Sequence, residues 1–300
     1  MAKRKKVASR DREREPPRPS WDSGGPRVAA SLALLDAPGF GADVASEIVT
    51  TASRLGAGIL AQGGSIRDLM QATVRVASLA VQGARGDAER KKLPVVGAAC
   101  SMGCSSCCYL HVSVTVPEAL VIAAYLRDTR SDEELVALRA VVEATAARVR
   151  TLDQGRRMIE KIACPLLSPH DGSCTAYLVR PLVCAAANSL DAAACARALE
   201  SGDAEATLPI DPLQRGGVRA TRIGLSVALR ARGLDAAHHE LAGALAIALA
   251  HDDAETRYLA GESVFPGAGS EGDPAASTLC ATWDAFIARD PHLSRVSALR

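Results

Sequence analysis

Cysteine is concentrated in one part of this 300-residue chain, and this constrains the fold more than any other feature of the sequence. The first four cysteines fall within nine residues and are separated mainly by Ser and Gly; four more follow at wider intervals. Eight of the nine cysteines therefore occupy about one third of the chain: Cys100, Cys104, Cys107, Cys108, Cys164, Cys174, Cys184 and Cys195. Thiols gathered this densely, without a secretion signal, are typical of metal ligands.

The spacing of the first four cysteines also allows a non-metal interpretation. On a helix they would share one face and could form a buried apolar stripe. The intervening residues are poor helix formers, however, so we favour a loop or a single helical turn wrapped on a metal. A framework of four disulfides is disfavoured by the size of the chain and by the adjacent pair Cys107-Cys108.

The adjacent pair Cys107-Cys108 bears on the number of metal sites. Neighbouring side chains diverge, so these two thiols serve two sites, or two corners of a larger cluster, more easily than one tetrahedral ion. Eight thiolates divide into two sets of four, and each set satisfies one Zn²⁺ or one iron–sulfur cluster. The wide spacing of the later cysteines and Pro165 after Cys164 favour iron–sulfur slightly. We expect the first four cysteines to need the later four.

Two other interpretations of the sequence, a radical S-adenosylmethionine motif and a histidine ligand, are less favoured than a metal site built from the eight cysteines. The spacing of Cys100, Cys104 and Cys107 matches that of radical S-adenosylmethionine enzymes, but Ser106 stands where those enzymes usually have an aromatic residue, and βα repeats are lacking. His111 lies close enough in sequence to be a ligand, but eight cysteines already fill two sites, so a packing role is favoured.

Composition predicts a mainly α protein with an irregular cysteine-rich, metal-binding region. Hydrophobic residues make up 48% of the chain and aromatics only 3%, which favours close-packed helices. The net charge of +1 makes nucleic-acid binding an unfavoured function. The longest apolar stretches, 119–126 and 241–250, are far shorter than the ~20 residues that span a bilayer. We expect a cytoplasmic protein without a membrane segment.

The chain is expected to comprise four regions: a disordered charged tail over 1–27, a helical region over 28–93, the cysteine-cluster domain over 94–200 and a helical region over 201–300. Capping residues Ser65, Thr115, Ser131 and Asp235 begin predicted helices, and Ser189 could begin another. Gly83, Gly86 and Pro94 are read as a linker into the cysteine region. Helices are predicted within 42–82, from 116, over 131–162, 189–199, 217–232, 235–250, 253–260 and 277–288, and a strand over 111–115.

Taken together, the cysteines and the residues around them resemble the CxxCxxCC-type zinc- or iron-chelating family (YkgJ-like cysteine cluster proteins). The resemblance rests on the eight cysteines and on further short motifs, namely Val116-Pro117-Glu118-Ala119, Cys164-Pro165-Leu166-Leu167, Tyr177 and Arg180-Pro181. It implies a metal-binding domain with the eight cysteines as ligands. Tyr177 and Arg180 map onto its tyrosine and Arg-Pro pair, where Arg180 would donate to thiolate charge and Tyr177 would cover the site.

The leading functional hypothesis is therefore metal binding, with iron as an iron–sulfur cluster or with zinc, as a structural or redox centre. One alternative is a metal-dependent enzyme distantly like the protein lysine methylases, which carry a similar cysteine pattern. Another is a scaffold in which zinc folds an interaction domain. A metal ion is the one partner that the sequence identifies.

Overall fold

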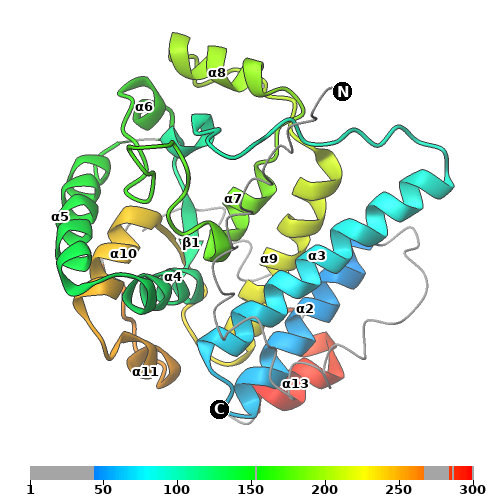
Figure 1. The fold of residues 1–300 in the computed structure, drawn as a ribbon. Helices are drawn as coiled ribbons and strands as arrows, with labels where there is room; N and C mark the ends of the chain where they lie inside the picture. Colours follow the sequence, from blue (N-terminus) through cyan, green and yellow to red (C-terminus); the bar gives the residue numbers. More distant parts are fainter. Residues whose placement is uncertain (1–43, 153, 267–283, 286, 299–300) are drawn as a thin grey trace, which may run out of the picture.

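The protein is mainly α in the computed structural model, as its composition predicts (Figure 1). The structure describes residues 44–152, 154–266, 284–285 and 287–298. Within these residues the only sheet has two antiparallel strands, β1 (Ser113–Thr115) and β2 (His238–Glu240). The predicted tail over 1–27, residues 28–43, Cys280 and most of the helix predicted over 277–288 lie outside the described residues.

Three long helices pack side by side in one half of the molecule (Figure 1). They are α2 (Val44–Ala61), α3 (Ile66–Arg90) and α9 (Pro212–Ala231). Ser65 begins α3 with the predicted capping box. A Cβ on Gly224 of α9 would lie only 2.5 Å from the Cβ of Ala52, so a glycine is needed where α9 crosses α2. The N-terminal helices are thus packed against a helix from the C-terminal third of the chain.

The other half is built around α4 (Val116–Thr129), α5 (Asp132–Val149) and α10 (Leu241–Ala250). The apolar helix α10 packs against both α4 and α5, and the short helix α11 (Ala254–Leu259) follows it. Strand β1 leads into α4, and β2 leads into α10. Pairing of the two strands, with Val114 opposite His239, therefore sets the relative positions of α4 and α10.

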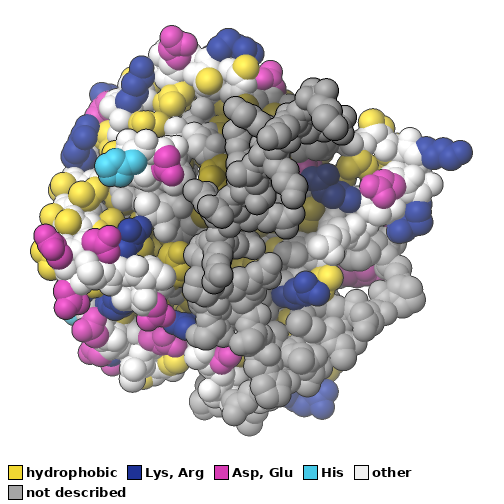
Figure 2. Space-filling view, viewed as in Figure 1, with side chains coloured by type: hydrophobic (Ala, Val, Ile, Leu, Met, Phe, Trp, Pro, Cys, Tyr) yellow, Lys and Arg dark blue, Asp and Glu magenta, His cyan; other side chains and the backbone are white. Residues whose placement is uncertain are grey.

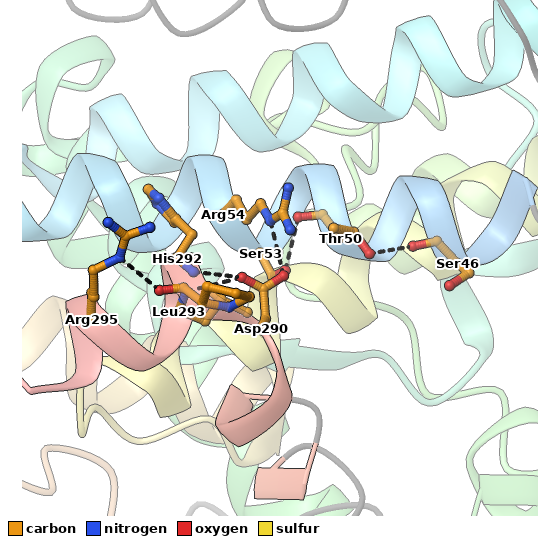
Figure 3. A network of polar contacts seen from close by, with 9 residues as sticks. Ser46, Thr50, Ser53, Arg54, Asp290, His292, Leu293 and Arg295 are labelled. Atoms are coloured by element: carbon orange, nitrogen blue, oxygen red, sulfur yellow. Dashed lines mark hydrogen bonds and ion pairs between the residues drawn. The ribbon is translucent and has the colours of Figure 1, made fainter.

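A polar network attaches the last described helix, α13 (Pro291–Ser297), to α2 (Figure 3). The carboxylate of Asp290 accepts the backbone N–H groups of His292 at 3.0 Å and Leu293 at 3.1 Å, and so caps α13. Its other oxygen accepts from Arg54 Nε at 2.9 Å. One aspartate therefore both begins α13 and pairs it with α2.

Some predicted boundaries were wrong. Helix α3 continues through Gly83 and Gly86 to Arg90, because its amphipathic face packs on α9. The helix predicted from Asp235 begins only at Leu241, because residues 238–240 pair with β1. The long helix predicted over 131–162 is divided into α5 and α6 (Gln154–Ile159). Helix α8 (Ala192–Ser201) is capped by Asp191 rather than by Ser189.

Two further observations concern the length of the helices and the charge of the surface. None of the described helices has the length and apolar character needed to cross a bilayer. Figure 2 shows acidic and basic side chains interleaved on the side of this face where α5 and α6 lie. The charge there is mixed in sign, in keeping with the net charge of +1.

Glu118 joins the helical scaffold to the cysteine region. The side chain is 2% exposed. One carboxylate oxygen accepts from the backbone N–H and the hydroxyl of Thr115, at 2.7 and 2.9 Å, which completes the predicted capping box of α4. The other accepts the backbone N–H of Leu182 at 2.7 Å, at the start of α7 (Leu182–Ala186). Because α7 carries Cys184, this carboxylate positions a predicted ligand.

Replacing Glu118 with Ala should lower the free energy of unfolding by about 3 kcal/mol, because two buried backbone N–H groups lose a charged acceptor. Urea unfolding followed by circular dichroism measures this change. The matched control is Glu134→Ala, which removes the exposed capping box of α5 and should cost less than about 1 kcal/mol. Equal losses in the two variants would show that Glu118 is only a local cap.

Candidate metal centre

The eight predicted ligands come from four segments that meet above the helical scaffold (Figure 1). Cys100 and Cys104 lie in a loop, and Cys107 and Cys108 lie in the short 3₁₀ helix η3 (Ser106–Tyr109) that follows it. Cys164 and Cys174 lie on a tight hairpin, Cys184 lies in α7 and Cys195 in α8. All eight are free thiols rather than disulfides.

Backbone hydrogen bonds join the hairpin to the first loop. The N–H of Cys164 donates to the carbonyl of Cys108 at 2.7 Å. Leu167 and Cys174 pair as an isolated antiparallel bridge within the hairpin. Two cysteine-bearing segments that are more than fifty residues apart in sequence are therefore connected directly at their cysteines.

A close contact between two glycines fixes how these segments cross. Gly103 and Gly172 have φ angles of +83° and +68°, in the left-handed region. A Cβ on Gly172 would lie 3.0 Å from the carbonyl oxygen of Gly103, and a Cβ on Gly103 would lie 3.2 Å from that of Asp171. Any larger residue at either position would push the loop and the hairpin apart.

The thiols lie in two neighbouring groups that can be distinguished by their surroundings. The inner thiols, defined here as Cys108, Cys164, Cys174 and Cys184, lie on the side of the scaffold; three of them, Cys164, Cys174 and Cys184, pack against the main hydrophobic core. Burial raises the pKa of Cys164 to about 11. Burial also raises the pKa of Cys184, and the neighbouring thiols of Cys164 and Cys174 raise it further.

The outer thiols are Cys100, Cys104 and Cys195, and Cys100 is exposed to solvent. Helix α8, which carries Cys195, packs against η3. Burial raises the pKa of Cys104, and the nearby charges of Cys100, Cys107 and Cys195 raise it further. The outer thiols are thus close enough to one another for their charges to interact.

Cys107 lies between the two groups. A hydrogen bond with Cys108 lowers the pKa of Cys107 and raises that of Cys108. The charge of Cys107 also raises the pKa of Cys104 among the outer thiols and those of Cys174 and Cys184 among the inner ones. Whether the adjacent cysteines face two sites or two corners of one cluster stays a prediction.

Backbone N–H groups are directed at four of the sulfurs. Cys100 Sγ accepts from the N–H of Ser189 at 3.2 Å. At three other cysteines the donor is the residue two positions later, namely Ser106 to Cys104, Leu166 to Cys164 and Ala176 to Cys174. Such bonds disperse the negative charge of a thiolate and fix its direction, which is how proteins support metal-binding sulfur.

Two arginines supply positive charge beside the thiols. Arg180 stacks on the ring of Tyr177, with its guanidinium carbon 4.3 Å from the ring centroid, and its charge lowers the pKa values of Cys107 and Cys174. Tyr177 itself is 58% exposed. Arg157 is 1% exposed, pairs with Glu240 at 2.6 Å, and its charge acts on Cys164.

The residues fit a thiophilic metal by chemistry, but they do not yet enclose one. A tetrahedral Zn²⁺ with Zn–S bonds of ≈ 2.3 Å requires sulfurs about 3.8 Å apart. In the described part of the chain, no three His, Cys, Asp or Glu side chains converge closely enough to define a metal position. Binding of one metal ion by these thiols would therefore require their side chains, or the segments that carry them, to come closer together.

Arg180 was named through the family resemblance, and its role as a donor to the thiolates stays a prediction; three other features that position the cysteine-bearing segments were missed. These are the second bond of Glu118, the buried Arg157–Glu240 pair and the contact between Gly103 and Gly172. Arg157 and Glu240 are 83 positions apart in the chain, so no local pattern indicates that they pair. The same holds for the contact between Gly103 and Gly172.

Replacing Gly172 with Ala should lower the free energy of unfolding by about 2 kcal/mol or more, through backbone strain and the clash with Gly103. The control is Gly63→Ala, because Gly63 has a similar φ of +71° but open space around it, and should cost only about 1 kcal/mol. Denaturant titration of both variants tests this. If the two losses match, the close crossing contributes nothing.

Comparison with known proteins gives one match. Neither the curated proteins nor the solved structures contain a match to this chain. Residues 99–202 match the model of the CxxCxxCC family, whose description is "putative zinc- or iron-chelating domain". The match covers about one third of the chain and includes all eight cysteines of the centre. It confirms the resemblance drawn from the cysteine spacing: residues 99–202 are similar to the zinc- or iron-chelating domains of the CxxCxxCC family.

Proposed function

We propose that the protein binds iron, as an iron–sulfur cluster, or zinc, through Cys100, Cys104, Cys107, Cys108, Cys164, Cys174, Cys184 and Cys195. The observation that carries the proposal is that separate cysteine-bearing segments meet at η3: the N–H of Cys164 donates to the carbonyl of Cys108 at 2.7 Å, and α8, which carries Cys195, packs against η3. Thiolates this close repel one another, and a bound cation removes that repulsion.

The supporting groups suit a negatively charged metal–thiolate centre. Four thiolates on Zn²⁺ carry a net charge of −2, which requires nearby donors and cations. Backbone N–H groups reach four sulfurs, and Arg157 and Arg180 add positive charge on the inner side. In this proposal Arg180 supports the thiolates directly, whereas Tyr177 holds the guanidinium by stacking.

The proposed role is structural or redox, and the burial of the inner thiols favours a structural contribution. The hairpin, α7 and η3 are short elements, and the sheet β1–β2 does not extend to them. Metal bound to the inner thiols would tie these elements to the core against which they pack. This also preserves the hypothesis of a zinc-stabilised scaffold, in which the metal folds a surface that other molecules contact.

Purification of the full chain without air, with iron, zinc and acid-labile sulfide measured per chain, tests the proposal. We expect bound metal, and Cys107→Ser should lower its amount because that thiol faces both groups. Visible absorption with sulfide would identify an iron–sulfur cluster, and a colourless protein loaded with zinc would exclude one.

The matched control is Cys280→Ser, which removes the one cysteine that lies outside the cysteine region in sequence and should leave the metal content unchanged. Circular dichroism shows whether each variant keeps its helices. A wild-type protein that stays metal-free after reconstitution, or a folded Cys107→Ser with full metal content, would contradict the proposal.

A further inference from the structure

A cleft of about 450 Å³ lies beside the cysteine region, between α3, α7, α9 and the short 3₁₀ helix η4 (Tyr177–Val179). Helices α3 and α7 both pack against α9, and the three can be followed next to one another in Figure 1. The volume falls within the range of ≈ 300–1,000 Å³ that is typical of small-molecule sites. Its walls come from three distant parts of the chain, so the complete fold is needed to form it.

The mouth of the cleft is apolar and exposed. Val74 is 49% exposed, and Leu178 is 56% exposed on the opposite wall, next to Tyr177. These are three of the large apolar side chains that the described surface leaves open to water. Deeper in the cleft, Leu182 and Val218 are buried. A ligand with a hydrocarbon body would cover this surface.

The charged residues that line the cleft are cationic. Arg85 and Arg180 both line it, and none of its described lining residues is Asp or Glu. Arg85 is held by an ion pair with Asp211, whose carboxylate is almost fully buried while the side chain of Arg85 is 28% exposed. Asp211 also caps α9, so Arg85 is anchored to a rigid element while part of its side chain stays exposed in the cleft. Fixed guanidinium groups in a cleft recognise carboxylate and phosphate.

From these observations we propose that the cleft binds a small organic anion. The hydrocarbon body of the ligand lies against Val74, Tyr177 and Leu178, and its carboxylate or phosphate oxygens accept from Arg85 and Arg180. Helix α7 lines the cleft through Leu182 and Ala185 and also carries Cys184, so the anion binds next to the cysteine centre. The proposal does not depend on which metal the thiols hold, or on whether they hold one.

Calorimetric titration of the full chain with four probes tests the ligand class. Hexanoate and hexyl phosphate combine a hydrocarbon body with an anionic head, whereas hexanol and inorganic phosphate each lack one of the two. We expect at least one of the first pair to bind about tenfold or more tightly than both of the second pair. The tighter of the two amphiphilic anions identifies the preferred head group. Hexanol binding as tightly as hexanoate and hexyl phosphate would overturn the proposal.

Three variants locate the binding. Arg180→Gln should weaken the preferred probe about tenfold, and Ser78→Trp, at an exposed lining position of α3, should block the cleft. Arg75→Gln is the matched control, because Arg75 is exposed on the same helix but does not line the cleft. Metal content measured on the same Ser78→Trp sample separates the two proposals, since it should not change. Unaltered affinity in Ser78→Trp would place the probe elsewhere and overturn the assignment.

Discussion

The cysteine region is constrained above all by the electrostatic repulsion that arises between neighbouring thiolates when the cysteines ionise. Segments almost a hundred residues apart bring eight cysteines to one side of a helical scaffold, where burial and the charges of neighbouring thiolates raise the pKa values of Cys104 and Cys184. Such an arrangement is unfavourable unless other groups compensate for the charge. The backbone N–H groups, Arg157 and Arg180 compensate for part of it, and a bound cation would compensate for much more.

A few polar contacts attach the cysteine-bearing segments to the helical scaffold. Glu118 joins the start of α4 to the start of α7, and the Arg157–Glu240 pair joins α6 to the start of α10. The hairpin and the first loop meet at Cys108, Cys164 and two glycines. Protein contacts therefore hold the cysteine-bearing segments next to one another in the described structure. The cleft beside Arg180 arises from the same packing of α7 on α9.

Much of the fold could be predicted from the sequence because its signals are local. Capping residues Ser65 and Thr115 began their helices as predicted, and the short strand before α4 was recognised from alternation. Predictions were wrong where a distant partner decided the outcome. Residues 238–240 form a strand because β1 pairs with them, although their neighbours are strongly helical.

The same distinction applies to the candidate site. The cysteine spacing indicated the similarity to the CxxCxxCC family that the match over residues 99–202 confirms, and that resemblance pointed to Arg180, whose charge lowers the pKa of Cys174. The second bond of Glu118 and the contact between Gly103 and Gly172 depend on residues more than sixty positions apart, so no local pattern indicates them.

Metal K-edge X-ray absorption on the full chain loaded with metal tests most directly whether the clustered cysteines bind the metal. If the cysteines bind the metal, we expect a first coordination shell of sulfur, about four atoms per metal. A shell composed mainly of nitrogen and oxygen would contradict it.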